Sequence, residues 1–217
     1  MYEHLRQTIP FEEFDYQSLL DSLRGYAYPR KKITSLLHKG EIIRVKKGLY
    51  LFGEGQRRFP YCRELLANLI YGPSCISLEY ALHYHGLTPE RVETITSVTC
   101  GRSRHFKTPV GCFSYRMIPM AAFSIGIDRI ELDDGRSFLM AIPEKALADR
   151  VMTERRSGIS TQKGLLIFLN DNLRIDSETL RSLDSARLLA FAAAYRSRRL
   201  KVLAGLIGRL RKEQSHA

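Results

Sequence analysis

Residues 28–52, YPRKKITSLLHKGEIIRVKKGLYLF, decide the fold of the first part of the chain. Pro29 suits the first turn of a helix, where its missing N–H is not needed. The stretch therefore predicts a short basic helix over residues 29–39, which a glycine then ends. Apolar residues recur along it at the i, i+3 and i+4 spacing of one helix face, namely Ile33, Leu36 and Leu37.

A basic hairpin is expected directly after this helix. Residues 42–45 and 49–52 are two short apolar runs joined by Lys47-Gly48, and glycine accepts the positive φ of a tight turn. A helix over 16–24, capped by Asp15, precedes the basic helix across a glycine-containing turn. This order is typical of a winged helix-turn-helix unit. Its first helix would have to come from the start of the chain, and the sequence predicts that helix to be short or missing.

Charge points to a polyanionic partner. The chain has 217 residues with 34 Lys and Arg against 23 Asp and Glu, a formal net charge of +11. A balance of this size favours nucleic acid first and an anionic surface second, with solubility alone as the simpler alternative. Between residues 24 and 58 only Glu41 and Glu54 oppose the basic residues, which are Arg24, Arg30, Lys31, Lys32, Lys39, Arg44, Lys46, Lys47, Arg57 and Arg58. Because solvated surfaces normally mix both signs, this segment indicates a nucleic-acid contact rather than a merely solvated basic face.

The glycine-rich, charged segment 53–58 is the best linker candidate. It divides the chain into a winged helix-turn-helix domain over 1–54 and an α+β domain over 59–217. The second domain is expected to contain an antiparallel or mixed sheet and a helical carboxyl end. Helices are expected near 61–71, 78–85, 143–153, 161–170, 178–196 and 200–212, and strands near 94–100, 113–118, 123–130 and 137–140.

Several classes of protein are disfavoured. The chain has no apolar run of the ~20 residues that a membrane span needs, and its start lacks a signal-peptide core. We therefore expect no membrane partner and a cytoplasmic location. No metal site and no cofactor are expected either, because the cysteines are widely spaced and form no CxxC pair, at Cys62, Cys75, Cys100 and Cys112.

Two histidines, His83 and His85, suggest a metal site at first sight. On a helix, however, residues i and i+2 point apart, so a structural role is favoured. Cys75 is expected to be a small core residue. The basic run between residues 196 and 212 is either a solvated face or a second contact surface, and helical spacing does not decide between them.

A metal-dependent nuclease is the alternative from another class. It would act through Glu131, Glu144 and Lys145, although their spacing is unspecific. The simpler interpretation is that Glu144 interacts with a helix dipole, and that Lys145 and Asp149, four residues apart, form an ordinary surface pair.

Four blocks together resemble the AbiEi-type antitoxins of type IV toxin–antitoxin systems. Residues 36–50 (LLHKGEIIRVKKGLY) are similar to that family's helix–wing signature, and residues 76–87 (ISLEYALHYHGL) to its second block. Residues 141–149 (AIPEKALAD) are similar to its third block, and 172–176 (NLRID) to a weaker fourth. The blocks follow in the family's order and cover most of the chain.

The resemblance implies a winged-helix domain that binds operator DNA and represses its own operon. It also implies that the second domain counteracts a nucleotidyltransferase-type toxin, directly or through the toxin's target. In such systems the toxin is the enzyme and the antitoxin is not. A homodimer on inverted repeats is one expected arrangement, and an orphan regulator without a toxin is an alternative.

The helix over 29–39 would enter the major groove, and the hairpin would contact the backbone. A pure protein-interaction module, with the basic segment binding an acidic partner, is the remaining alternative. The side chains expected to meet base edges are Arg30, Lys31, Thr34, Ser35 and His38. Those expected to contact phosphates are Lys32, Lys39, Arg44, Lys46 and Lys47.

Overall fold

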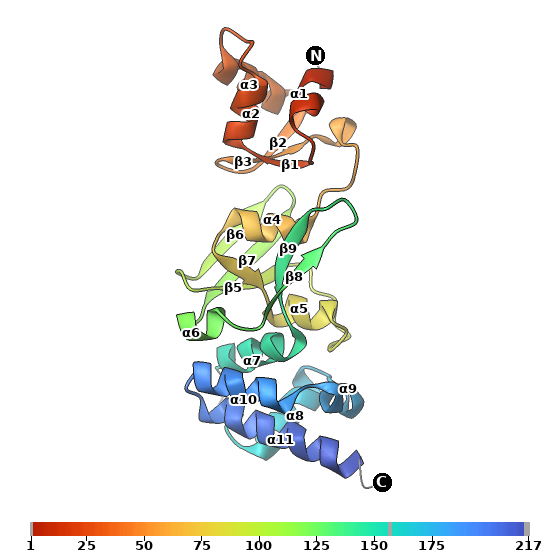
Figure 1. Cartoon of the computed structure of the whole chain (residues 1–217), viewed down its shortest axis with the longest axis vertical. Coiled ribbons are helices and arrows are strands. Elements are labelled where there is room, and N and C mark those ends of the chain that lie inside the picture. Colours follow the sequence, from red (N-terminus) through yellow and green to blue (C-terminus); the bar gives the residue numbers. More distant parts are fainter. Residues whose placement is uncertain (1, 156–157, 215–217) are drawn as a thin grey trace.

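A computed structural model describes residues 2–155 and 158–214. Figure 1 shows an elongated molecule with the amino-terminal unit at one end, a six-stranded sheet in the middle and a layer of helices at the other end. The buried apolar side chains form two clusters, a small one in the first unit and a large one in the rest of the chain. The class is therefore α+β, as the sequence predicts.

The first unit combines three helices with a three-stranded antiparallel sheet in the strand order β1-β3-β2. Its core is built from all three helices and the sheet, around Leu19, Leu36 and Phe14. The helices are α1 (Tyr2–Thr8), α2 (Tyr16–Ser22) and α3 (Pro29–His38). The strands are β1 (Glu13–Asp15), β2 (Ile42–Lys46) and β3 (Leu49–Phe52).

Local chemistry explains where these elements begin and end. The Asp15 carboxylate accepts a hydrogen bond of 2.7 Å from the Ser18 amide, which satisfies a free N–H at the start of α2. Pro29 occupies the first turn of α3, and Gly40 follows the helix with a φ of 68°, a left-handed conformation that favours glycine. The predicted helix and hairpin are therefore present where the sequence places them.

The start of the first unit agrees with expectation in one feature and differs in another. Helix α1 is short, as predicted, and it buries Leu5 in the small cluster, which Ile9, just after the helix, joins. With so few apolar residues it gives a weak periodic signal. Strand β1, which pairs with β3, was not expected, because Glu12 and Glu13 are charged and interrupt the apolar pattern that predicts a strand.

The β2–β3 hairpin lies between the two cores. Tyr50 and Phe52 of β3 pack in the small cluster with the helices, whereas Leu49 and Leu51 pack in the large one. Alternate residues of a strand point to opposite faces, so one short strand serves both units. The hairpin therefore belongs to the first unit and also forms its contact surface with the second unit.

The second unit is organised on a mixed sheet with the strand order β6-β7-β5-β4-β9-β8. Strands β5 and β7 are parallel, as are β4 and β9, while the other neighbouring pairs are antiparallel. Strands β6 and β8 are the two edges. The strands are β4 (Ser74–Ile76), β5 (Ile95–Thr99), β6 (Arg104–Thr108), β7 (Gly111–Met117), β8 (Ile127–Glu131) and β9 (Ser137–Ala141).

Helices cover this sheet and extend beyond it. Helix α4 contacts strands β4, β5 and β9 on the side of the first unit, and α7 packs between α5 and the carboxyl-terminal helices α10 and α11 (Figure 1). The helices are α4 (Arg63–Ile70), α5 (Leu78–Tyr84), α6 (Met120–Phe123), α7 (Pro143–Thr153), α8 (Gln162–Ile167), α9 (Ser177–Ser182), α10 (Ser185–Ala194) and α11 (Arg198–Gln214). A 3-10 turn (Glu54–Gln56) and a π-helical turn (Phe168–Asn172) complete the elements.

Several predicted boundaries in this unit are wrong. The strand expected over 123–130 begins only at Ile127, because helix α6 extends to Phe123 and a turn over 124–126 follows it. The single helix expected over 178–196 is two helices, since Asp184 caps α10 through the Ala186 amide at 2.7 Å. Strands β4 and β6 were not expected. None of the helices described is long and apolar enough to cross a membrane.

Candidate nucleic-acid interface

The outward face of α3 carries the residues expected to read bases. Arg30, Lys31, Thr34 and His38 are exposed, and Ser35 is half-buried. Helix α3 contains no acidic residue, and neither Arg30 nor Lys31 forms an ion pair with any part of the chain that the structure describes. The structure therefore brings these side chains together on one unpaired basic surface.

Local contacts hold part of this surface in place. The Lys31 ammonium lies 5.0 Å from the ring centroid of Tyr28, and the Lys32 ammonium lies 5.4 Å from that of Tyr26. Such cation–π contacts restrain a flexible lysine without neutralising its charge. The Thr34 hydroxyl donates to the Arg30 carbonyl at 3.1 Å, which leaves its oxygen free to accept.

Of the residues expected to contact phosphates, three are exposed and two are half-buried. Lys39 is exposed just after α3, and Lys47 is exposed at the hairpin turn. Arg44 is exposed and pairs with Tyr50 across the sheet, so it lies on the face that carries α3. Lys32 is half-buried.

Lys46 lies in a different environment from the others. Its ammonium donates a hydrogen bond to the carbonyl oxygen of Ile70, at the end of α4 in the second unit. The neighbouring turn is also fixed, because the Tyr16 amide donates to the Gly48 carbonyl at 3.0 Å. The bond to Ile70 orients the Lys46 ammonium toward the second unit, so Lys46 has a role in holding the two units together.

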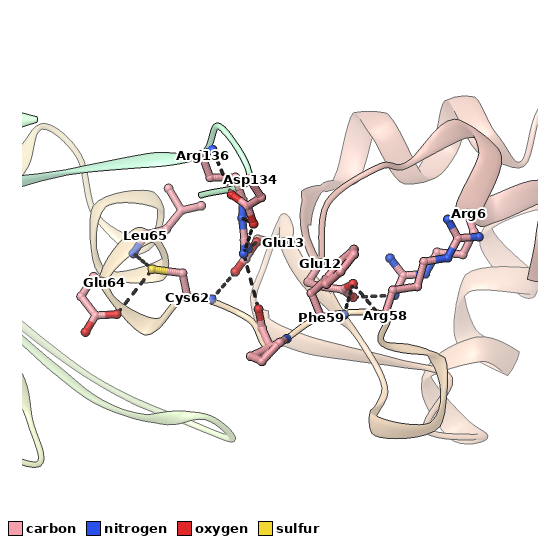
Figure 2. Close-up of polar contacts among 11 residues, drawn as sticks. Arg6, Glu12, Glu13, Arg58, Phe59, Cys62, Glu64, Leu65, Asp134 and Arg136 are labelled. Atoms are coloured by element: carbon pink, nitrogen blue, oxygen red, sulfur yellow. Dashed lines mark hydrogen bonds and ion pairs between the residues drawn. The ribbon is translucent and has the colours of Figure 1, made fainter. Parts of the chain in front are cut away.

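Buried carboxylates reinforce this junction (Figure 2). Glu13, in β1, accepts a hydrogen bond of 2.5 Å from the Cys62 amide and an ion-pair contact of 2.5 Å from Arg136. Arg136 comes from the turn between β8 and β9, and it also binds Asp134 at 2.6 Å. Arg136 of the second unit thus binds strand β1 of the first unit through Glu13.

The preceding residue, Glu12, fixes the segment predicted to be a linker. One of its oxygens accepts from the Arg58 and Phe59 amides at 3.0 and 3.2 Å, and the other pairs with Arg6 at 2.5 Å. Arg6 also donates to the Gln56 carbonyl. Residues 54–59 are therefore bound to the first unit by buried charges rather than free.

The second unit contains a buried charge cluster formed by Lys145, Asp149, Ser77 and Tyr195. Lys145 and Asp149 are both fully buried and lie 3.2 Å apart, so the expectation of an ordinary surface pair is wrong. Asp149 also accepts from the Ser77 hydroxyl at 2.7 Å and from the Tyr195 hydroxyl at 2.6 Å. The Lys145 ammonium makes a further bond of 2.8 Å to the Ala122 carbonyl.

Burial dominates the electrostatics of this cluster. It raises the pKa of the Asp149 carboxyl, and the Lys145 ammonium and the two hydroxyl donors oppose that rise. Burial likewise raises the pKa of the Cys75 thiol, which agrees with the prediction of a core residue. The Lys145–Asp149 pair is fully buried and hydrogen-bonded on both sides, which is typical of a structural network.

The residues of the nuclease alternative are not assembled into a site. Glu144 is buried and accepts a hydrogen bond of 3.0 Å from the Asp184 amide. Besides its place at the start of α7, it therefore fixes the start of α10. Glu131 is exposed on the edge strand β8, 3.8 Å from Arg129. Lys145 is inaccessible. Within the described ranges, no group of three or more His, Cys, Asp or Glu side chains is arranged to hold a metal ion.

The histidine pair is also structural. His85 binds the Ala141 carbonyl through Nε2 at 2.8 Å, and His83 approaches the Thr88 carbonyl at 3.4 Å. The two rings therefore serve different parts of the fold, as the helical spacing predicts.

Comparison with known proteins adds nothing to this geometry. No protein-family model matches the chain, and no curated protein matches it either. The sequence did not predict the junction residues Glu12, Glu13 and Arg136, because Glu13 and Arg136 are 123 positions apart and none of the three follows a local spacing rule.

Proposed function

We propose that this protein binds duplex DNA, with α3 in the major groove of an operator, as a winged helix-turn-helix repressor. The observation that carries the proposal is the exposed basic face of α3, which has no acidic partner on the helix. The order α1-β1-α2-α3-β2-β3, with both strands of the hairpin paired behind the helix, supports the winged-helix assignment.

Different side chains would serve affinity and specificity. Arg30 and Lys31, near the start of α3, and Ser35, on its outer face, would read base edges. Lys39, Arg44 and Lys47 would contact phosphates and supply sequence-independent affinity. Because Lys46 binds the Ile70 carbonyl, we assign it first to the junction.

An antitoxin role extends this proposal. It rests on the resemblance of four sequence blocks to the AbiEi-type antitoxins, which implies repression of the protein's own operon and neutralisation of a nucleotidyltransferase-type toxin. The same resemblance favours a protein that is not itself an enzyme. The direct test is growth of cells that carry the adjacent operon: deletion of this protein should be toxic only while a neighbouring nucleotidyltransferase gene is intact.

Selection from a pool of randomised duplexes tests the DNA-binding proposal. The wild-type protein should enrich a defined sequence, and Ser35→Ala or Lys31→Gln should relax the preference at particular positions. Arg24→Gln is the matched control, because Arg24 is an exposed arginine of the same unit that pairs with Asp21 at 2.7 Å. Its enriched sequence should equal that of the wild type.

Two outcomes would contradict the proposal. If no duplex is retained even at low salt, the basic surface serves a protein partner instead. If duplexes are retained but Ser35→Ala and Lys31→Gln enrich the wild-type sequence without loss at any position, α3 is not the reading element.

A further inference from the structure

A second basic surface lies on the edge of the central sheet, outside the segments that the sequence singles out. Residues 101–127 contain no aspartate or glutamate. Strand β6 forms one edge of the six-stranded sheet and pairs only with β7. The basic side chains of this β6–β7 edge are all exposed, and they are Arg102, Arg104, His105, Lys107 and Arg116.

The pairing register gathers several of these side chains. His105 lies opposite Ser114 and Lys107 lies opposite Cys112, so His105 and Lys107 point to one face of the sheet. Arg116, two residues beyond Ser114 on β7, points to that face as well. Arg104 lies opposite Tyr115 and points to the other face, at the rim of the edge.

A shallow hollow of about 350 Å³ opens on this edge. Guanidinium, imidazole and hydroxyl groups surround it, and all of these can donate hydrogen bonds to phosphate oxygens. Strand β6 also has an unpaired outer edge, whose backbone N–H groups are further donors. The hollow is lined by Ser103, Arg104, His105, Ser114, Tyr115 and Arg116.

The opposite edge of the sheet shows that this charge is not a general property of its strands. On β8, Arg129 pairs with Glu131 at 3.8 Å, and in the following turn Arg136 pairs with Glu13 and Asp134. Over the part of the chain that the structure describes, none of the basic side chains of the β6–β7 edge forms an ion pair. Their charge is therefore available to a partner.

We propose that the β6–β7 edge binds the phosphate backbone of the same duplex, beyond the sequence that α3 reads. This inference rests on the proposed DNA-binding function. Figure 1 places α3 at one end of the molecule and β6 in its middle, so a contact at both would extend along the duplex. A simpler role for the charges is protection of an exposed edge strand against pairing with another chain. That role predicts no effect on DNA binding.

The test compares two duplexes that share one selected site. The short duplex contains the site alone, and the long one adds about one helical turn, roughly 10 base pairs, on each side. The variant R104Q/K107Q/R116Q removes three charges of the β6–β7 edge. The control R91Q/R129Q/R174Q removes three exposed arginines that pair with Glu93, Glu131 and Glu90.

The wild-type protein should bind the long duplex more tightly and with a steeper salt dependence. The edge variant should lose that gain, with a salt slope on the long duplex lower by about two to three units, roughly 0.9 per lost phosphate contact. On the short duplex it should equal the wild type, and the control should equal the wild type on both.

The outcomes separate this inference from the proposed function. Equal binding of the long duplex by the edge variant and the control, with wild-type binding intact, would overturn the inference alone. Failure of the wild-type protein to bind the short duplex would refute the function of α3. If the edge variant loses affinity equally on both duplexes, the second contact does not lie beyond the α3 site.

Discussion

Helices α3 and α7 have similar sequences in their first turns, but the charged side chains of that turn are exposed in α3 and buried in α7. Both place a proline in the first turn and follow it with charged residues, Arg30 and Lys31 in α3 and Glu144 and Lys145 in α7. In α3, Arg30 and Lys31 face solvent, and neither forms an ion pair with the residues that the structure describes. In α7 they are buried, and each is held by hydrogen bonds from other parts of the fold.

The difference follows from what packs around each helix. Helix α3 lies at one end of the molecule with one face on a small core, whereas α7 is enclosed by α5, α10 and α11. A charge that the fold satisfies internally stabilises one structure, and a charge that it leaves unpaired can serve a partner. Substitutions in α7 should therefore change stability, and substitutions on α3 should change binding.

The largest expected effect is at the buried charge cluster. Lys145→Met should destabilise the protein by about 3–5 kcal/mol, because it leaves the Asp149 carboxylate buried with its ionic partner removed. Urea unfolding at pH 7 measures the loss. The double variant Lys145→Met/Asp149→Leu should recover much of the stability, since it removes both charges. A double variant no more stable than Lys145→Met would contradict this account.

The junction should give the next largest effect. Arg136→Ala leaves the buried Glu13 without its ion-pair partner and should cost about 3 kcal/mol. Because the bond joins the two units, thermal unfolding should also become less cooperative between them. Arg24→Ala is the control, with an expected cost below about 1 kcal/mol, since its pair with Asp21 is exposed. Equal losses in the two variants would show that the junction contact is unimportant.

A smaller effect is expected at the start of α2. Asp15→Ala should cost about 1 kcal/mol at pH 7, because it removes the carboxylate that caps the Ser18 amide. That hydrogen bond lowers the pKa of Asp15 below its usual 3.8. The contribution is therefore complete above pH 3.8 and is lost as the pH falls through the lower folded value. Unfolding measured between pH 7 and pH 2.5 should show the two proteins converging.

The smallest effect on stability is expected on α3 itself. Lys31→Gln and Arg30→Gln should each change the free energy of unfolding by less than about 0.5 kcal/mol, because both side chains are exposed and unpaired by acids. The same variants should weaken DNA binding. A loss of several kcal/mol in stability would mean that α3 depends on these charges, and the contrast with α7 would fail.

The sequence predicts the parts of this fold that rest on local patterns. The stripe of Ile33 and Leu36, the proline start and the glycine stop together place α3 and the hairpin correctly. It does not predict the environment of Lys145 and Asp149, because a spacing of four residues is the same in a surface pair and in a buried one. Nor does it predict the ion pair between Arg136 and Glu13, which joins residues 123 positions apart.

The candidate surface follows the same division. The basic character of residues 24–58 and the exposed side of α3 could be read from charge and periodicity. The turn of Lys46 toward Ile70 could not, since it depends on how the second unit packs beneath the hairpin. The basic surface on the β6–β7 edge could be recognised only from the strand register, because β6 lacks the apolar alternation that predicts a strand.

The salt dependence of binding to the selected duplex tests the central claim most directly. Lys39→Gln/Lys47→Gln should lower the slope of log affinity against log salt by about two units, roughly one for each lost phosphate contact, whereas the matched loss of two paired charges, Arg91→Gln/Arg129→Gln, should leave it unchanged. An unchanged slope in the first variant would contradict the account, because the exposed lysines beside α3 and at the hairpin turn would then not contact DNA.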